Sequence, residues 1–250
     1  MAPDAPPFSI VPEGESALTV RFAGAPAHAL PFVRAAEHAL GAARLPTPCE
    51  LAPAYAALTV VYDPLGATYA QMHTAISQAL ASLEAVGTPS ARTVVIPVCY
   101  GSTPQTASLG PDLASLAAHC GLAPVEVARL HAARTYRIDM LGFMPGFPYL
   151  SGLDERLRCP RLATPRTAIP AGSVGIGDNQ TGVYPLASPG GWHLIGRTPA
   201  RLFDPTRAQP VPYGAGDSLR FEPIDLETFH YLVHQESHGH SCLHFEEASR

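Results

Sequence analysis

Residues Leu141 to Pro205 read LGFMPGFPYLSGLDERLRCPRLATPRTAIPAGSVGIGDNQTGVYPLASPGGWHLIGRTPARLFDP. The stretch is dense in glycine, which permits a positive φ or a close backbone approach, and in proline, which restricts φ and removes a donor. It also holds polar side chains that suit a binding site, namely Arg161, Arg166, Gln180, Tyr184, His193 and Arg197. Because turns on a rigid framework commonly carry function, we predict a site built mostly from turns on a β framework.

The composition is that of a globular protein, with 46% apolar and 15% charged residues among 250. No run of about 18 apolar residues occurs, so we expect no membrane-spanning helix and no membrane partner. The first residues lack the basic and apolar regions of a secretory signal, which predicts a cytoplasmic location. A net charge of −5 with scattered basic residues argues against a nucleic-acid partner.

All 16 basic residues are arginines. The missing lysine excludes a Walker A phosphate loop and Schiff-base chemistry, whereas arginine suits bidentate binding of carboxylate or phosphate. The five cysteines are far apart and form no CxxC pair, so we expect reduced thiols and neither a disulfide framework nor a zinc site.

Residues 1–90 predict a small α/β domain. Leu18, Val20 and Phe22 alternate with polar residues, as in a half-buried strand. The expected elements are strands over 18–22, 55–62 and 93–100, a further short strand before them, and helices over 31–43 and 68–83, with Pro31 in a first turn. The resulting β-α-β-β-α-β pattern suggests a ferredoxin-like sandwich.

Residues 91–225 predict two helices and then a β-barrel or sandwich. Asp112 is expected to cap the first helix, Gly121 to end it and Pro124 to open the second. Short strands separated by Gly or Pro follow, in TYRIDML, SVGIG, TGVYPL, WHLIGR and DSLRFEPI. Residues 226–250 are expected to form a short helix and then a disordered, His-rich tail. Several of its histidines would share one helix face, so adventitious metal binding is the alternative to a solvated tail.

Long strings within this region carry a family resemblance. They are GFMPGFPYL from Gly142, the two arginines of PRLATPR, IPAGSVGI from Ile169, QTGVYPLASPGGWHLIGRTP from Gln180, and LFDP from Leu202. They resemble the B-subunit family of ATP-dependent 5-oxoprolinase, also described as allophanate hydrolase subunit 1 or KipI-like. The resemblance implies an α+β protein: a small N-terminal α/β domain followed by a cyclophilin-like β-barrel.

The family implies a protein that has little activity alone. With subunits C and A it would open 5-oxo-L-proline to L-glutamate, with ATP and Mg²⁺ as co-substrate and no tightly bound cofactor or metal. Two alternatives share the same motifs. One is a KipI-like inhibitor of a sensor histidine kinase, and the other is a module of urea or allophanate metabolism.

Residue type and motif placement give candidate roles. His131 and Arg166 are candidate catalytic residues, although a satisfied core histidine and a bridging arginine are the competing interpretations. The candidate substrate-binding residues are Arg161, Gln180, Tyr184, Ser188, Gly190, Gly191, Trp192, His193 and Arg197. For several of them the competing interpretation is structural: Gly190-Gly191 as a tight turn, and Tyr184 and Trp192 as packing residues. Phe143, Phe147 and Tyr149 are interpreted as core or partner-interface residues. Asp178-Asn179 and His193 depart from the family pattern inside the suspected site, where they would tune substrate choice.

Overall fold

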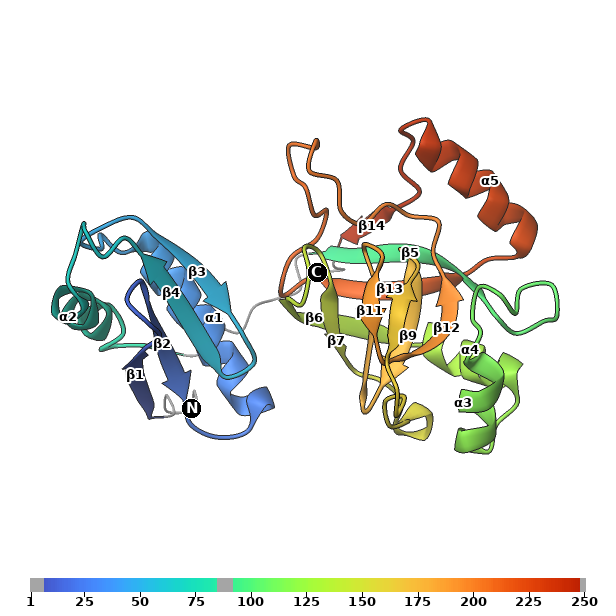
Figure 1. The fold of residues 1–250 in the computed structure, drawn as a ribbon, viewed down its shortest axis with the longest axis horizontal. Coiled ribbons are helices and arrows are strands. Elements are labelled where there is room, and N and C mark those ends of the chain that lie inside the picture. The colour runs from blue at the N-terminus through green and yellow to red at the C-terminus, as the bar shows by residue number, and fades with distance from the viewer. Residues whose placement is uncertain (1–6, 85–91, 248–250) are drawn as a thin grey trace. The chain divides into compact units, whose positions relative to one another are not determined.

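The computed structural model describes residues 7–84 and 92–247 and divides into two compact units, residues 1–89 and 90–250. The first unit is a small sheet with helices and the second is a β-barrel (Figure 1). The expected α+β class, with a small sheet-and-helix domain ahead of a β-barrel, is therefore confirmed.

The first unit is a four-stranded sheet in which every neighbouring pair is antiparallel, in the order β1-β2-β4-β3. Two hairpins joined by a helix build it. In chain order the elements are β1 (Phe8–Pro12), β2 (Ala17–Phe22), α1 (Pro26–Ala42), β3 (Cys49–Pro53), β4 (Ala57–Tyr62) and α2 (Tyr69–Ala79).

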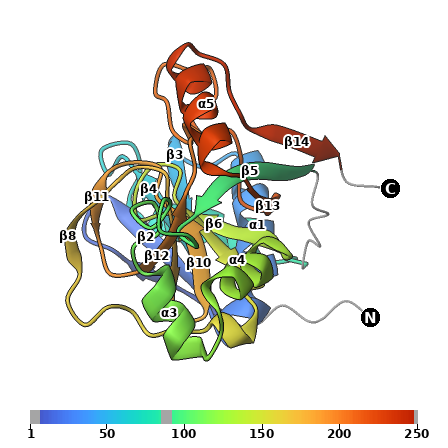
Figure 2. The ribbon, with the colours of Figure 1, turned by 90° about the vertical axis from the view of Figure 1, so that its right-hand side faces the viewer.

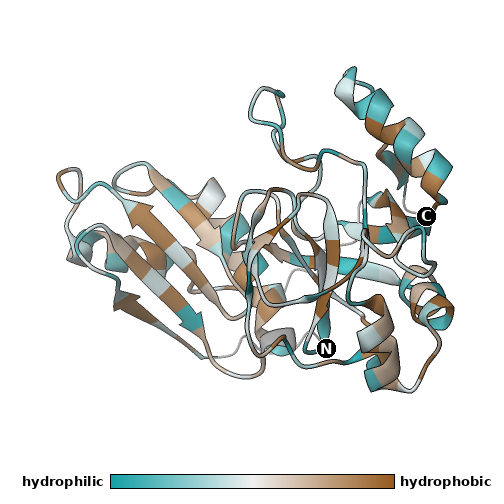
Figure 3. Cartoon of the chain, turned by 45° about the vertical axis from the view of Figure 1, so that its right-hand side comes forward, coloured by the Kyte–Doolittle hydropathy of each residue, from teal (hydrophilic) through white to brown (hydrophobic). Residues whose placement is uncertain are grey.

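One face of this sheet is apolar because side chains alternate between the two faces of a strand. Leu18, Val20 and Phe22 of β2 are buried, as are Leu58 and Val60 of β4. Figure 3 shows this alternation as brown bands separated by paler ones along the strands. The helices supply the rest of the core, with Phe32, Val33, Leu40, Met72 and Ile76. The strand expected over residues 18–22 is thus confirmed.

The order of elements in this unit differs from expectation. It is β-β-α-β-β-α, and the strand expected over residues 93–100 belongs to the barrel instead. Helix α1 begins at Pro26, so Pro31 lies inside it and not in its first turn. Because proline is tolerated in the first turn of a helix, the sequence predicted a start at Pro31. The helix starts earlier, since the residues before Pro31 are also compatible with a helix. Thr68 caps α2 in a reciprocal pair with Gln71.

The second unit is a closed barrel of seven strands, in the order β12-β9-β10-β7-β6-β13-β5. It closes where β5 pairs with β12, with Cys99 opposite Arg197 and Tyr100 opposite Gly196. Only the pairing of β13 with β5 is parallel among these strands. Their bounds are β5 (Arg92–Tyr100), β6 (Thr135–Leu141), β7 (Pro148–Ser151), β9 (Ser173–Gly177), β10 (Gln180–Val183), β12 (His193–Arg197) and β13 (Ser218–Pro223).

Helices and a small ribbon flank the barrel. Helices α3 (Leu113–Cys120) and α4 (Pro124–Ala132) pack Leu113, Leu116, Val127 and Leu130 into the barrel core. Helix α5 (Leu226–Ser237) lies on the opposite side of the barrel from them (Figures 1 and 2). The ribbon pairs β8 (Arg166–Ile169) with β11 (Ser188–Gly190), and a short 3-10 helix, η1, spans Glu155–Leu157.

The described part of the tail ends in a strand, where the sequence suggested disorder. Residues His244–Glu247 form strand β14, which pairs antiparallel with the beginning of β5. Two contacts hold this strand: Arg220 pairs with Glu246 at 2.6 Å, and the Arg92 guanidinium lies 4.8 Å from the centre of the Phe245 ring. The strand was missed because all four of its residues are exposed, so it carries no apolar alternation.

Two global features complete the fold. Within residues 7–84 and 92–247, none of the helices combines the length and the apolar character needed to cross a membrane. All five cysteines are free thiols, in keeping with the expectation of reduced cysteines.

The loop between β5 and α3 approaches β12 so closely that Gly110 has no room for a side chain. The Gly101 amide donates to the Ile195 carbonyl at 3.0 Å, and a Cβ on Gly110 would lie 2.5 Å from that carbonyl carbon. Gly110→Ala is expected to lower the free energy of unfolding by about 2 kcal/mol, because backbone atoms must move. Urea unfolding followed by the fluorescence of the single tryptophan, which lies in the barrel unit, measures this. Gly214→Ala is the control, since a Cβ there meets open space; equal stability of the two variants would contradict the close approach.

Candidate functional site

A cavity of about 290 Å³ opens on the barrel unit beside the ribbon of β8 and β11. We call it the aromatic cavity, because its lining includes Arg161 and five aromatic side chains, Phe143, Phe147, Tyr149, Tyr184 and Trp192. The Phe147 ring is the centre of the cluster, with its centroid 5.0 Å from Tyr149, 5.2 Å from Tyr184 and 5.5 Å from Trp192, all edge to face. Such pairs add to the stability gained by burial, so the walls are rigid.

Glycines on two strands make the seat of the Trp192 ring. A Cβ on Gly177 of β9 would lie 2.6 Å from the indole Nε1, and a Cβ on Gly182 of β10 would lie 3.1 Å from Cζ3. A Cβ on Gly175 would likewise lie 3.2 Å from the Trp192 Cβ. The ring lies directly on the barrel wall because these strands have no side chains there, and Trp192 is 4% exposed. Trp192 therefore packs against the barrel wall and also lines the cavity.

Arg161 places a positive charge over this aromatic floor. Its guanidinium carbon lies 5.9 Å from the centre of the Trp192 ring, within cation–π range. Its Nε donates to Asp178 Oδ2 at 2.9 Å, and no described residue hydrogen-bonds its terminal nitrogens. Asp178 stands at the β9–β10 turn with φ of +58°, and its backbone exchanges two hydrogen bonds with Cys159. Asp178 thus orients the arginine of the cavity.

Tyr184 contributes a neutral hydroxyl. Burial raises the pKa of Tyr184 to about 12, although a hydrogen bond with the backbone of Trp192 opposes that rise. The hydroxyl therefore stays protonated and is able to donate. It lies under Gly190, where a Cβ would be 2.8 Å from the phenol oxygen. Gly190 and Gly191 also line the cavity, so glycine at 190 is required by close approach and not only by a turn.

Arg166 lies outside the lining of the aromatic cavity. Its Nη2 donates to Asp112 Oδ1 at 2.6 Å, and Asp112 Oδ2 accepts the Leu194 amide at 2.7 Å. Asp112 takes the N-cap position of α3, as expected, but its side chain makes no capping hydrogen bond, because these two donors occupy the carboxylate. The Asp112 backbone amide donates to the Leu194 carbonyl at 3.0 Å. Arg166 and Asp112 therefore tie α3 to the strand that follows Trp192, a bridging arrangement.

His131 is fully buried among aromatic residues of the barrel core. Thr181 Oγ1 donates to the Gly175 carbonyl at 2.9 Å, so it accepts from His131 Nε2–H at 2.8 Å. His131 Nδ1 then accepts from the Tyr100 hydroxyl at 2.7 Å. Both ring nitrogens are satisfied, and burial lowers the pKa of His131 to about 3. We infer a structural role for this histidine, which is absent from the lining of the aromatic cavity.

The remaining candidates are dispersed. Gln180 begins β10 opposite Gly177, and Ser188 begins β11 opposite Ile169; neither lines the aromatic cavity. His193 also lies outside that lining, and its Nε2 donates to the Pro160 carbonyl at 3.0 Å. Arg197 lines a different, larger cavity beneath α5.

The candidate residues that the structure brings together are thus Arg161, Tyr184, Gly190, Gly191 and Trp192. Sequence reasoning assigned Phe143, Phe147 and Tyr149 to the core or an interface, but all three line the cavity. The sequence held one signal for Phe143, which stands beside Gly142 in a run of turn-forming residues. In the structure Phe143 has a φ of +65° and is 60% exposed, which places its ring at the cavity rim.

The described part of the chain holds no group of three or more His, Cys, Asp or Glu side chains placed to bind a metal ion. In the His-rich tail, the rings of His234 and His238 approach to 4.3 Å between centroids, and His238 Nδ1 donates to the His234 carbonyl. That nitrogen is therefore committed to the helix end.

The Trp192 seat gives a spectroscopic prediction. Gly177→Ala is expected to displace the indole ring, because the added methyl would overlap it, and to shift the tryptophan emission to the red as the ring gains solvent. Trp192 is the only tryptophan, so the emission spectrum reports this site alone. Gly191→Ala is the matched control, since its nearest neighbour would be 3.7 Å away. Identical spectra for both variants would show that Gly177 does not seat the ring.

The buried histidine gives a pH prediction. The pKa of His131 is about 3 in the folded chain and 6.5 unperturbed, so between these values only the unfolded state binds the proton. The contribution of the neutral His131 ring to the free energy of unfolding is complete above pH 6.5. It falls with acidification, by up to about 1.4 kcal/mol per pH unit. His131→Gln is expected to be less stable at pH 7 but to lose less on acidification, measured by urea unfolding from pH 7 to pH 4. The exposed residue His244, changed to Gln, serves as control; parallel pH profiles for wild type and His131→Gln would contradict this assignment.

Comparison with known proteins identifies the family. The family model described as "Carboxyltransferase domain, subdomain C and D" matches residues 8–213. A Bacillus subtilis protein named as the B subunit of 5-oxoprolinase is 41% identical over 191 residues, covering 72% of this chain and 78% of the relative. One of the same name from Escherichia coli O157:H7 is 56% identical over 135 residues, covering 54% of this chain and 60% of the relative. The match thus spans less than two thirds of that relative.

Solved structures share the fold. The crystal structure of TTHA0988 has a TM-score of 0.70 at 34% identity, over 84% of this chain and 40% of that one. The Kluyveromyces lactis urea amidolyase has a TM-score of 0.78 at 16% identity, over 99% of this chain and 17% of that one, which shows a shared fold. The chain therefore belongs to the carboxyltransferase-domain family that includes the B subunit of 5-oxoprolinase.

Proposed function

We propose that this chain is the B subunit of an ATP-dependent 5-oxoprolinase. It acts with subunits C and A to open 5-oxo-L-proline to L-glutamate, with ATP and Mg²⁺ as co-substrate and without a tightly bound cofactor. The relatives at 41% and 56% identity are both named as the B subunit of 5-oxoprolinase, which supports this choice within the family.

The observation that carries the proposal is Arg161 held over the floor of the aromatic cavity. 5-Oxoproline is a small, nearly flat ring with one carboxylate. A cavity of about 290 Å³ with aromatic walls accommodates such a ring, and the Arg161 terminal nitrogens provide a donor pair for its carboxylate. The neutral Tyr184 hydroxyl is a donor for the lactam oxygen.

Lactam opening is uphill at neutral pH, so coupling to ATP is chemically sensible. In the proposed route the lactam oxygen attacks the γ-phosphorus and ADP leaves. Water then adds to the activated carbon, and the carbon–nitrogen bond breaks while the amine takes a proton, which leaves an acyl phosphate. A second water attacks this acyl phosphate and releases phosphate and the free carboxylate. The role of this chain is to bind and orient the lactam, because its cavity offers an aromatic floor, one cation and one hydroxyl donor. The reaction therefore needs the partner subunits, and the isolated chain has little activity.

One alternative has an observation behind it. A protein named putative urea carboxylase from Emericella nidulans is 26% identical over 136 residues. A small amide handled in urea or allophanate metabolism would occupy the same cavity; urea has no carboxylate for Arg161, whereas allophanate carries one. Removal of that cation thus distinguishes urea from 5-oxoproline, and allophanate is distinguished by which substrate the reconstituted complex turns over.

The test is reconstitution. Phosphate release by a mixture of this chain with subunits C and A is expected to depend on 5-oxoproline and to vanish when this chain is omitted. Arg161→Gln is expected to lower kcat/KM for 5-oxoproline by about tenfold or more, because a charge-assisted hydrogen bond is lost, while the complex still assembles. Arg158→Gln is the control, since Arg158 is exposed and lies outside the cavity lining. A full mixture of folded subunits without 5-oxoproline-dependent turnover would refute the proposal.

A further inference from the structure

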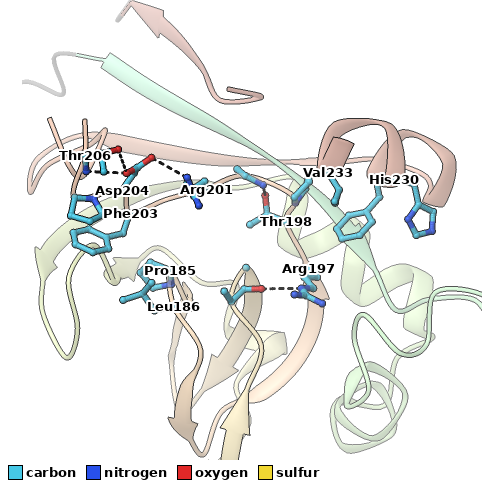
Figure 4. Close-up of a pocket in the computed structure, with 16 residues that line it drawn as sticks. Pro185, Leu186, Arg197, Thr198, Arg201, Phe203, Asp204, Thr206, His230 and Val233 are labelled. Carbon is cyan, nitrogen blue, oxygen red and sulfur yellow. Dashed lines mark hydrogen bonds and ion pairs between the residues drawn. The ribbon is translucent and has the colours of Figure 1, made fainter. Parts of the chain in front are cut away.

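A second cavity lies between the barrel and α5. Its volume is about 840 Å³, and it shares none of its lining residues with the aromatic cavity. Strand β12 and the segment after it form one side, the turn at Pro185-Leu186 another, and Phe229, His230 and Val233 of α5 the cover (Figure 4). A volume of this size is typical of small-molecule sites. We call it the α5 cavity.

Two arginines line the α5 cavity, Arg197 and Arg201, and Arg201 is paired with Asp204 at 3.1 Å. Arg197 Nε donates to the Ala171 carbonyl at 2.9 Å, and its side chain packs beside Gly172, where a Cβ would lie 3.5 Å from Arg197 Cγ. These contacts hold the half-buried guanidinium in one orientation. Among the residues that the structure describes, its two terminal nitrogens have no hydrogen-bond or ion-pair partner. Arg197 thus presents two parallel donors and a full charge to the cavity.

The carboxylate in this lining does not neutralise Arg197. Asp204 accepts from Thr206 Oγ1 at 2.6 Å, from the Thr206 amide at 3.0 Å and from Arg201 at 3.1 Å. These hydrogen bonds, led by the Thr206 hydroxyl, hold the pKa of Asp204 below its usual range. Figure 4 shows the Asp204–Thr206 group at one end of the cavity and Arg197 toward the other. A half-buried cation without a counter-ion favours an anionic ligand.

The remaining walls are largely apolar. Pro185, Leu186, Phe203, Phe229 and Val233 all line the cavity. Phe229 is buried, whereas Leu186 and Val233 are 38% and 43% exposed, so the apolar surface continues from the interior to the mouth. A ligand with an apolar body would cover this surface while its charged end reaches Arg197.

We propose that the α5 cavity binds a small organic carboxylate with an apolar body, with its carboxylate bidentate on Arg197. A carboxylate fits better than a phosphate, because one guanidinium matches its single charge and its two coplanar oxygens. The site is separate from the aromatic cavity and goes beyond the proposed 5-oxoprolinase function, since it neither requires nor supplies that activity.

The test uses 3-phenylpropionate as the probe and its uncharged amide, 3-phenylpropionamide, as the reference, titrated calorimetrically into the full chain. The acid is expected to bind saturably, with a dissociation constant on the order of millimolar for a ligand of this size. The amide is expected to bind at least about tenfold more weakly. Absence of saturable binding by the acid, or equal binding of acid and amide, would overturn the proposal.

Three variants show in which cavity the probe binds. Arg197→Gln is expected to weaken binding of the acid by about tenfold or more and to leave the amide unchanged. Val233→Trp on α5, where the residue is partly exposed, keeps Arg197 intact and is expected to block both probes while preserving the unfolding temperature. Arg161→Gln in the aromatic cavity is the matched control and should bind the acid like wild type. Loss of binding in Arg161→Gln, or full binding in Val233→Trp, would move the probe out of the α5 cavity and overturn the assignment. The readout is binding alone, so failure here leaves the 5-oxoprolinase test untouched.

Discussion

The functional end of the barrel depends on the close approach of the Trp192 ring to the backbone of β9 and β10. Protein interiors are close-packed, so an indole ring lies flat on a strand pair only where no Cβ stands in its way. Gly177 and Gly182 provide that surface, even though glycine in a strand interior weakens the strand. With the ring seated, Phe147 and Tyr184 pack against it and Arg161 lies over it. The floor, walls and charge of the aromatic cavity all follow from this one contact.

The regular parts of the fold could be predicted because their signals are local. Alternation in residues 18–22 predicted β2, and Gly121 and Pro124 correctly marked the end of α3 and the beginning of α4. The errors arose where a distant partner decides the outcome. Strand β5 belongs to the barrel because its partners, β12 and β13, come about a hundred residues later in the chain. Strand β14 has no pattern of its own and forms because β5 leaves an edge to pair with.

The candidate site shows the same division among the arginines. Arg161, Arg166 and Arg197 stand in similar Gly- and Pro-rich surroundings, so the sequence grouped them. The structure separates them by their partners: Asp178 pairs with one and orients it over a ring, Asp112 pairs with the second, and a backbone carbonyl accepts from the third. None of these partners is near its arginine in sequence, which is why residue type and motif could group the three arginines but could not predict which arginine faces which cavity.

The pairing of β14 with β5 also brings the two ends of the barrel unit together. Glu247, near the end of the described chain, is the register partner of Arg92, the first described residue of the unit. Cα atoms of such partners lie about 5 Å apart, so the polypeptide enters and leaves the barrel at nearly one point. A module with this property can be spliced into a larger polypeptide without rearranging its core.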